Sequence, residues 1–270
     1  MSSPSHSIVV VVPWFKQRLT AEEQISLRHL DHYLGAYDIC RIGPNGISSG
    51  GLRYPLQAFE ADDFRTASSY SRLLLTSRFY RRFQAYEFML IYQLDCLVFC
   101  SDLGAWCRGE YDYIGAPWVR TDSDGRKRFT RVGNGGLSLR RIESFLRVIE
   151  SPRTRPWYDS KQLRMAGQLP DVRELPWWQG LKKQLSVLRE LHQGPVWYVS
   201  NYSVNEDRFW SDRARLFDPD FSIAPVEVGL RFAFECEPRF CFEQLGRQLP
   251  FGCHGWARYD RGFWEPYLLA

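Results

Sequence analysis

Carboxylates that could bind a metal ion or move a proton stand in two short motifs. The first is Gln93-Leu94-Asp95, which lies in a run of apolar residues typical of a buried strand. An apolar strand of an open α/β sheet that delivers a carboxylate at its carboxyl end places it where ligands bind. An oxygen ligand there can hold a divalent cation that bridges two phosphates. The structural alternative is that Asp95 only ends a strand and caps a turn.

The second motif is Asn205-Glu206-Asp207. A carboxylate beside a substrate hydroxyl can act as a general base, so this acidic pair could take the proton of an attacking group. The same three residues also suit the start of a helix, because Asn is a favoured N-cap and acids in the first turn interact well with the helix dipole. Both interpretations fit the sequence.

Two glycine-rich segments could hold the backbone close to a ligand. In Gly133-Asn134-Gly135-Gly136 the glycines allow close approach, and Asn134 offers both a donor and an acceptor. A plain tight turn is the alternative. Among the 5 histidines, His254 is the one in a loop bracketed by glycines and flanked by aromatics, Phe251 to Trp256. A structural histidine with satisfied hydrogen bonds is the alternative there.

The elements that must position these motifs alternate between strands and helices. The apolar run 7–13 predicts a buried strand, and Thr20 followed by Ala-Glu-Glu-Gln predicts a capped helix running to about Leu34. Further strands are expected at 37–42, 87–99, 111–115 and 136–139, and further helices at 67–83 and 141–149. This alternation predicts an α/β fold with a mostly parallel central sheet, and we expect residues 1–270 to form a single domain.

Residues 151–195 differ from the rest in composition. Basic residues outnumber acidic ones there, Trp157, Trp177 and Trp178 fall within the segment, and an amphipathic helix is expected near 181–191. We expect an insertion or lid within the domain. Its tryptophans either pack on the domain or lie with the helix on an anionic membrane surface.

Composition excludes several classes of protein. With 44% hydrophobic and 24% charged residues, the chain is globular rather than disordered. No run approaches the ~20 apolar residues of a membrane span, and the early apolar run lacks the basic leader of a secretory signal. The cysteines, 7 in number and without a CxxC, favour a reducing cytoplasm over a disulfide framework or zinc ribbon. A net charge of +4 is too small to indicate nucleic-acid binding.

Taken together, the motifs resemble nucleotide-sugar glycosyltransferases of the GT-A fold. More closely, the chain resembles a little-characterised bacterial and fungal family of glycosyltransferase-like domains of unknown function. The resemblance covers most of the chain outside 151–195. It rests on the motifs QLDCLVF (93–99), YDYIGAPW (111–118), VGNGGLSLR (132–140), NED (205–207) and LPFGCHGW (249–256). It implies a Rossmann-like GT-A domain.

The resemblance also implies a metal site. Glycogenin-like enzymes carry an Asp-x-Asp motif at the end of a strand, and here Gln93 matches its first position and Asp95 its second, usually a direct metal ligand. A late histidine completes the coordination in many such enzymes, which implies His254. A divalent cation, Mn²⁺ or Mg²⁺, is therefore expected. Because Gln93 adds no charge, metal affinity is expected to be weaker, and metal independence stays an alternative.

Donor-binding roles follow from the same resemblance. Tyr70-Ser71-Arg72-Leu73 is similar to a family helix that carries a basic residue toward the donor diphosphate, which implies Arg72. The end of the first strand is expected to contact the nucleotide base, and the glycine-rich segment to border the sugar pocket. The implied donor site thus contains Pro13, Trp14, Arg72, Gln93, Asp95, Asn134, Gly135 and Gly136.

The acceptor side completes the expected site. In galactosyltransferases an acidic pair follows such glycines and one acid deprotonates the acceptor, which implies Asp207 as the first choice of base and Glu206 as the second. Three tryptophans in or beside the motifs are expected to stack on a sugar or the acceptor: Trp118, Trp210 and Trp256.

The implied reaction is transfer of a sugar from a nucleoside diphosphate sugar, with UDP favoured, to a hydroxyl of a saccharide or a lipid-linked saccharide. Such a reaction fits the synthesis of surface polysaccharides or glycoconjugates by a cytoplasmic protein, peripheral to the inner face of the membrane through 151–195. One alternative is a catalytically weak nucleotide- or carbohydrate-binding module, which the Gln93 departure favours. The other is a nucleotidyltransferase, although Pro13-Trp14-Phe15 stands where such enzymes have a glycine-rich, basic phosphate loop.

Overall fold

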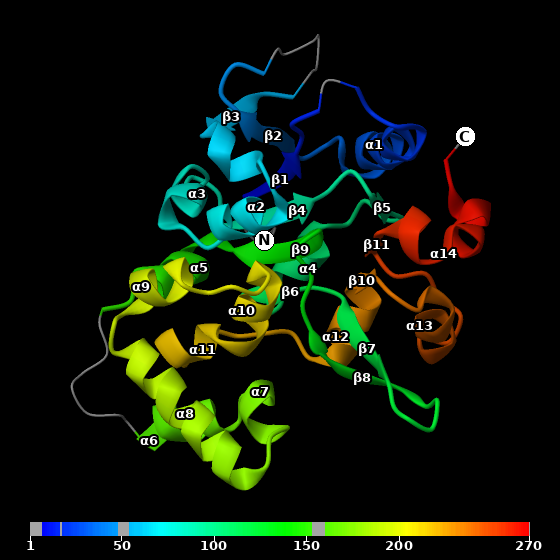
Figure 1. The fold of residues 1–270 in the computed structure, drawn as a ribbon. Coiled ribbons are helices and arrows are strands. Elements are labelled where there is room, and N and C mark those ends of the chain that lie inside the picture. The colour runs from blue at the N-terminus through cyan, green and yellow to red at the C-terminus, as the bar shows by residue number, and fades with distance from the viewer. Residues whose placement is uncertain (1–6, 17, 48–53, 153–159, 270) are drawn as a thin grey trace, which may run out of the picture.

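The computed structural model describes residues 7–16, 18–47, 54–152 and 160–269 (Figure 1). Its centre is a six-stranded sheet with the strand order β3-β2-β1-β4-β9-β6. Parallel pairing joins β3 (Leu56–Phe59), β2 (Asp38–Pro44), β1 (Ile8–Pro13) and β4 (Phe88–Tyr92). Antiparallel pairing adds β9 (Leu137–Arg141) to β4, and β6 (Tyr113–Ile114) to β9. The predicted α/β class with a mostly parallel central sheet is confirmed.

Helices cover both faces of this sheet because its strands are apolar on both sides. Side chains alternate along a strand, so Val9 and Val11 of β1 point to one face and Val10 and Val12 to the other. The first pair shares its core with α2 (Ala67–Leu73), α3 (Ser77–Arg81) and α5 (Ile142–Ile149). The second pair shares its core with α1 (Ala21–Leu34) and α4 (Gly104–Cys107). Burial on both faces accounts for the unbroken apolar run of β1.

Two smaller sheets flank the central one. Strand β11 (Gly252–His254) lies between β10 (Ala233–Phe234), to which it is parallel, and β5 (Cys96–Val98), to which it is antiparallel. Strands β7 (Pro117–Thr121) and β8 (Lys127–Val132) form a hairpin. Neither this hairpin nor β3 was predicted from the sequence.

Of the remaining helices, η1 lies between β3 and α2, and the others follow α5. They are η1 (Ala61–Phe64), α6 (Ser160–Gly167), α7 (Pro170–Arg173), α8 (Trp177–Leu191), α9 (Pro195–Ser200), α10 (Glu206–Asp212), α11 (Ala214–Phe217), α12 (Val226–Phe232), α13 (Pro238–Gln244), α14 (Trp256–Trp264) and η2 (Glu265–Tyr267). Within the described part of the chain, no helix has both the length and the apolar character needed to cross a membrane.

Local sequence explains where some elements begin and end. The predicted capping box of α1 is present, with the Thr20 hydroxyl accepting from the Glu23 N–H and the Glu23 carboxylate accepting from the Thr20 N–H. The helix predicted over 67–83 is instead two helices, α2 and α3. Leu73, Leu74 and Leu75 are all buried, and three consecutive residues cannot lie on one face of a helix, so the chain turns there.

The strand predicted over 87–99 is also divided. Strand β4 ends at Tyr92, and a turn closed by the Cys96 N–H donating to the Gln93 carbonyl leads into β5, which joins a different sheet. The division leaves Asp95 just beyond the carboxyl end of β4. This is the edge at which the sequence analysis expected it.

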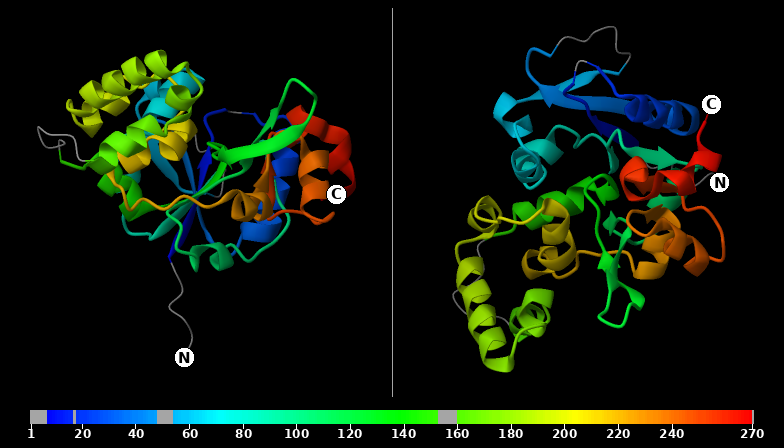
Figure 2. Two further views of the ribbon diagram at one scale, coloured as in Figure 1. Left: turned by 90° about the horizontal axis from the view of Figure 1, so that it is seen from below. Right: turned by 45° about the vertical axis from the view of Figure 1, so that its right-hand side comes forward.

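The segment 151–195 contributes α6, α7 and α8, which lie to one side of the central sheet in all the views (Figures 1 and 2). Helix α8 begins at Trp177, earlier than the predicted start near Leu181. Of the tryptophans noted there, Trp157 lies outside the described residues. Of the two alternatives for these tryptophans, packing on the domain does not describe Trp177, which is 82% exposed, whereas Trp178 is 48% exposed.

Candidate active site

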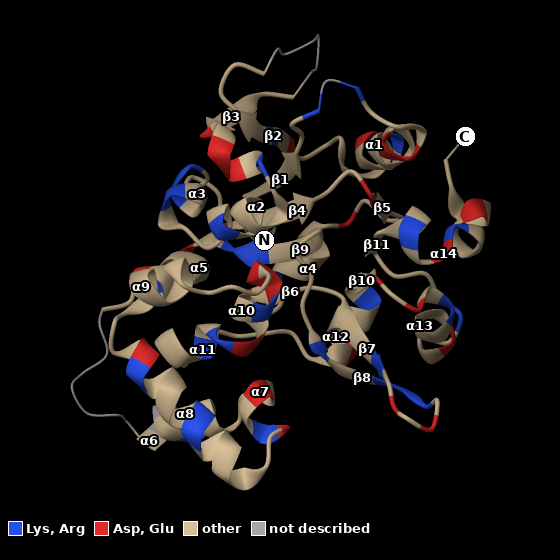
Figure 3. Cartoon of the chain, in the orientation of Figure 1, with Lys and Arg blue, Asp and Glu red and all other residues tan. Residues whose placement is uncertain are grey.

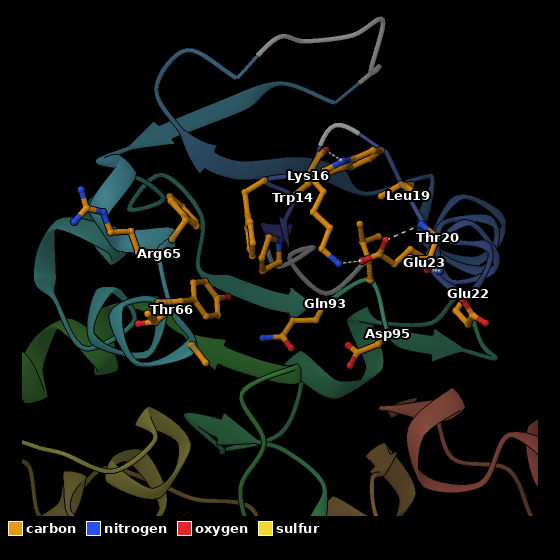
Figure 4. Close-up of a pocket in the computed structure, with 16 residues that line it drawn as sticks. Trp14, Lys16, Leu19, Thr20, Glu22, Glu23, Arg65, Thr66, Gln93 and Asp95 are labelled. Atoms are coloured by element: carbon orange, nitrogen blue, oxygen red, sulfur yellow. Dashed lines mark hydrogen bonds and ion pairs between the residues drawn. The ribbon is translucent and has the colours of Figure 1, made fainter.

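A cavity of about 580 Å³ opens at the carboxyl ends of β1 and β4 (Figure 4). The loop after β1, the start of α1, the segment before α2 and the turn after β4 form its walls. Among the residues that line it are four of those expected to bind the donor: Pro13, Trp14, Gln93 and Asp95. Ligand sites of open α/β sheets lie at this edge, as the sequence analysis expected.

Aromatic rings form much of the cavity wall. Phe15 is 41% exposed and its ring lies 5.5 Å from that of Phe64, which in turn stacks on Tyr70 at 6.3 Å. Trp14 is nearly buried, and its indole N–H donates to the Lys16 carbonyl. An apolar wall with one accessible ring suits the flat face of a planar ligand group.

A cation at the cavity was not anticipated from the sequence. Lys16 lines the cavity, its side chain is 55% exposed, and its Nζ lies 2.7 Å from Oε1 of Glu23 (Figure 4). The same Glu23 completes the capping box of α1, so the helix start fixes the position of the lysine's partner. A lysine after a strand is too common in sequences to have served as a signal.

The turn after β4 brings Asp95 beside His254. In the antiparallel pairing of β11 with β5, His254 stands opposite Cys96, the residue after Asp95. Nε2 of His254 lies 3.5 Å from Oδ1 of Asp95, and the Asp95 side chain is 51% exposed. The two residues expected to bind a metal ion, far apart in sequence, are therefore neighbours.

Glu235 holds the other side of the histidine ring. It directly follows β10, the parallel neighbour of β11, and its Oε1 lies 2.9 Å from Nδ1 of His254. Burial opposes protonation of the imidazole, but the Glu235 hydrogen bond and the negative charge of Asp95 outweigh it and raise the pKa of His254. Glu235 was not predicted from the sequence to have a role in the site.

The donor set of Asp95 and His254 suits a divalent cation such as Mn²⁺, which accepts both carboxylate and imidazole ligands. A ligating histidine usually donates its other ring N–H to a carboxylate, and Glu235 stands in that position. Across the described residues, no three His, Cys, Asp or Glu side chains form a complete metal site. Asp95 and His254 would therefore hold the cation together with oxygens from the substrate or water.

The glycine-rich segment packs directly on this histidine. A Cβ atom added to Gly136 would lie 2.2 Å from Nε2 and Cδ2 of His254, so only glycine allows the ring to sit there. The Gly136 carbonyl accepts from the Gln93 N–H, which ties the segment to the turn after β4. Gly135 is half-buried and lies against the carboxylate of Glu206.

The Asn134 side chain stabilises the turn of the glycine-rich segment. It is fully buried, and Oδ1 accepts from the N–H groups of Gly136 and Leu137 at 2.7 and 2.9 Å. The expected contact between Asn134 and the donor stays a prediction, since Nδ2 has no hydrogen-bond partner among the described residues. The side chain builds the turn that Gly135 and Gly136 present.

Glu206 is the buried member of the acidic pair. Its side chain forms an ion pair with Arg140 at 2.9 Å, and Arg140 also donates to Tyr80. Burial raises the pKa of Glu206 to about 7, although Arg140 counteracts part of this. With an exposed fraction of 3%, Glu206 has little access to a substrate, so the geometry favours a positioning role at the start of α10.

Asp207 is the more accessible member. It is half-buried in the first turn of α10, and its Oδ1 accepts from the Arg208 N–H. Burial raises the pKa of Asp207, and the negative charge of Glu235 adds to this shift. The negative charge of Asp207 adds to the raised pKa of His254, after the effects of Glu235 and Asp95, and Asp207 is not among the residues that line the cavity.

Two of the three tryptophans expected to stack on a sugar or acceptor cannot do so. Trp210 and Trp256 are both 0% exposed. Trp210 packs on Phe145 with ring centroids 4.1 Å apart, and Trp256 donates its indole N–H to Ser26. Both stacking assignments are wrong, because helices α10 and α14 turn these rings into the core.

Two other expected residues lie at the surface. Trp118 is half-buried, packs against Gly133, and lies beneath the guanidinium of Arg131 at 4.9 Å. Arg72 is exposed on α2 and donates to Ser68, and it is not among the residues that line the cavity. The diphosphate contact expected of Arg72 stays a prediction, as does the stacking role of Trp118.

Solved structures similar to this chain include glycosyltransferases. One, described as a glycosyltransferase involved in the glycosylation of the major capsid of PBCV-1, is 9% identical with a TM-score of 0.43, and the alignment covers 92% of this chain and 91% of that one. The galactosyltransferase LgtC, in complex with donor and acceptor sugar analogs, is 13% identical with a TM-score of 0.39, over 92% and 86%.

A cytidylyltransferase from Leptospira borgpetersenii is also similar, with 11% identity and a TM-score of 0.32 over 56% of this chain and 66% of that one. At TM-scores below 0.5, these likenesses carry no conclusion about chemistry. No curated protein matches the sequence.

A family model described as "Protein of unknown function (DUF5672)" matches residues 53–254. The match includes Gln93, Asp95, the glycine-rich segment, the acidic pair and His254, and it extends over more than half of the chain. This protein therefore belongs to the DUF5672 family.

Proposed function

We propose that this protein is a glycosyltransferase that moves a sugar from a nucleoside diphosphate sugar to a hydroxyl group. The observation that carries the proposal is that Asp95, which lines a cavity with an aromatic wall, contacts His254, whose ring also contacts Glu235; His254 and Glu235 do not themselves line the cavity. Asp207 is a half-buried acid whose negative charge adds to the raised pKa of His254. This combination supplies an apolar surface for the nucleobase of the donor and ligands for a cation. It also supplies a carboxylate that could take the proton of an acceptor hydroxyl.

The donor would lie with its nucleotide base against the aromatic wall near Phe15 and its diphosphate toward Asp95. A divalent cation held by Asp95 and His254 would offset the charge that develops on the departing diphosphate. Lys16, at the same cavity, would add a second positive charge near the phosphates. UDP-sugars are the donors we favour.

The remaining residues of the site would activate the acceptor or hold other groups of the site in position. Asp207 would take the proton of the attacking hydroxyl, since its carboxylate is half-buried and has a raised pKa. Glu206 would hold the start of α10 through its ion pair with Arg140. Glu235 would orient His254 through Nδ1.

A panel of UDP-, GDP- and TDP-sugars tests the proposal through release of the nucleoside diphosphate, with Mn²⁺, with Mg²⁺ and with a chelator. We expect turnover of one donor class, at a rate lowered about 100-fold or more by Asp95→Asn. Asp124→Asn is the matched control, because Asp124 is an exposed acid at the turn of the β7–β8 hairpin. If no donor is turned over under any of these conditions, the transferase proposal fails.

A catalytically weak binding module is the second candidate, and Gln93 favours it. This residue lines the cavity at the place where a second carboxylate would strengthen a metal site, and its amide adds no negative charge there. Calorimetry with nucleoside diphosphates, with and without Mn²⁺, distinguishes the two candidates when combined with the donor panel. Binding without turnover of any donor would favour the module.

We further propose that the reaction serves the synthesis of a surface polysaccharide or glycoconjugate in the cytoplasm, with a saccharide or lipid-linked saccharide as acceptor. All of the cysteines are free, which fits a reducing compartment. Fractionation of the cell that makes the protein tests the location. Transfer to a panel of saccharide and lipid-linked acceptors, with the donor identified above, tests the acceptor class.

A further inference from the structure

Exposed apolar side chains concentrate on the helices of one segment. Most of the large hydrophobic side chains that are exposed in the described residues lie between Leu163 and Trp197. On α8 they are Trp177, Trp178, Leu181 and Leu185, with exposed fractions of 82%, 48%, 51% and 48%. Large apolar groups gathered in this way usually mark an interaction site.

These four residues, here named the α8 surface, share one side of the helix. At 100° per residue, positions 177, 178, 181 and 185 fall within an arc of about 100°. The packed residues of α8 are Gly180, Val187, Leu188 and Leu191, which lie on the neighbouring side of the helix, with Leu188 within the same arc one turn after Leu185. The α8 surface therefore widens the apolar side of the helix in its first half, where the side chains are exposed instead of packed.

Cations accompany this face. Lys182 is exposed next to Leu181, and its Nζ lies 5.2 Å from the ring of Trp178. Arg173 and Arg189 are also exposed on α7 and α8. Figure 3 shows basic residues along these helices, together with acidic ones.

The nearby acids have partners that reduce their negative charge. Asp171 pairs with Arg213 at 2.6 Å, and Glu174 pairs with Arg120 at 3.2 Å. The exposed lysine and arginines thus give this side of the molecule a positive character. An apolar surface bordered by positive charges favours a binding partner that carries negative charge.

We propose that the α8 surface binds an anionic membrane, with α8 lying in the plane of the interface. Tryptophan and leucine on one side of a helix, with lysine and arginine beside them, match the chemistry of the lipid headgroup region. Lys182 can keep its ammonium among anionic headgroups while its stem and Trp178 contact the acyl chains. This proposal stands on α8 alone and does not depend on the transferase activity.

Co-sedimentation of the full chain with vesicles tests it, using phosphatidylcholine alone and phosphatidylcholine mixed with phosphatidylglycerol. We expect binding to the anionic vesicles, little binding to the neutral ones, and weaker binding as salt is raised. The double variant Trp177→Ser with Trp178→Ser should weaken partitioning at least about tenfold. Tyr259→Ser, which removes an exposed aromatic on α14, should leave it unchanged.

A charge-matched pair of variants tests whether the exposed cations beside the α8 surface contribute to membrane binding. Lys182→Gln with Arg189→Gln should weaken partitioning about fivefold for each cation. Arg126→Gln with Arg128→Gln changes the net charge equally, but on the β7–β8 hairpin, and should have little effect. Since all these side chains are exposed, unchanged thermal unfolding is expected and verifies the fold of every variant.

Several results would overturn the proposal. They are no vesicle binding, equal binding to neutral and anionic vesicles, and a tryptophan double variant that binds as well as the original protein. A dimer in size-exclusion chromatography that the tryptophan double variant converts to a monomer would also overturn it. That last result would assign the face to a second copy of the chain.

Discussion

Nε2 of His254 lies 3.5 Å from Oδ1 of Asp95, and Nδ1 of the same ring lies 2.9 Å from Oε1 of Glu235. The first contact follows from the pairing of β11 with β5, and the second from the pairing of β11 with β10. A small side sheet therefore aligns two acids and an imidazole at the carboxyl end of β4. The orientation of the imidazole depends on this alignment.

Replacing Glu235 tests its role as a positioning residue. Glu235→Gln keeps the size of the side chain but removes the charge that favours a proton on Nδ1 of His254. We expect affinity for Mn²⁺, measured by calorimetry in the presence of nucleoside diphosphate, to fall about 10- to 100-fold. This is the usual effect of removing a carboxylate that hydrogen-bonds a metal-binding histidine. The pKa of His254, followed by NMR, should fall as well, because Glu235 helps to raise it.

Glu237→Gln is the matched control for this experiment. Glu237 stands two residues further along, and its carboxylate pairs with Lys127 on the β7–β8 hairpin, away from the histidine. Loss of Mn²⁺ affinity in both variants, or in neither, would refute the positioning role of Glu235.

The fold was largely predictable because strong local patterns coincide with its main elements. The run of β-branched residues in β1 and the capping box at Thr20 gave correct positions for the first strand and helix. Strand β3 and the β7–β8 hairpin were missed, since their residues are only partly buried and lack an apolar run. Leu73 to Leu75 were predicted to continue a single helix. The burial of all three residues depends on tertiary packing, which the local sequence pattern does not reveal.

The site was predictable in part. Asp95 and His254 stand out by their motifs, and the structure brings them together. Trp210 and Trp256 were misassigned because closeness in sequence to a motif does not determine which way a ring points. Glu235 and Lys16 were missed, since a single charged residue next to a short strand has no distinctive spacing.

Substitution of Gly136 tests how closely the glycine-rich segment and His254 fit. A Cβ atom at this position would lie 2.2 Å from the imidazole, so Gly136→Ala should displace the ring from Asp95. We expect donor turnover to fall at least about tenfold while the secondary structure by circular dichroism stays the same. Gly104→Ala is the control, because the nearest atom to its added Cβ would be 3.8 Å away.

If Gly136→Ala turned over donor as fast as the unaltered protein, the packing of His254 on the segment would have no bearing on activity. If Gly104→Ala lost as much activity as Gly136→Ala, the effect would reflect general damage and not the histidine.

The burial of Glu206 predicts how stability changes with pH. Burial raises the pKa of Glu206 to about 7, from an ordinary value of 4.5. Between these values the folded protein holds a proton on Glu206 that the unfolded chain releases, so this group stabilises the fold fully below about 4.5. Its contribution is lost as pH rises toward about 7.

Urea unfolding of the original protein and of Glu206→Gln, across this pH window, measures the effect. The free energy of unfolding of the original protein should fall more steeply with rising pH than that of the variant, since glutamine does not titrate. The comparison rests on the difference between the two slopes, because the variant also leaves Arg140 without its charged partner. Parallel slopes would show that Glu206 does not titrate in this window.

Asp207 provides the test of how the acceptor is activated. Asp207→Asn removes the proposed base while leaving a side chain of similar size that can still accept from the Arg208 N–H. We expect transfer to an acceptor to fall about 10²- to 10⁴-fold, with little change in donor affinity. Because the pKa of Asp207 is raised, the rate of the original protein should increase with pH as this carboxyl ionises. Asp207→Asn should lose that part of the pH profile, whereas the control Asp124→Asn should retain it. A full transfer rate in Asp207→Asn would assign the proton to another group.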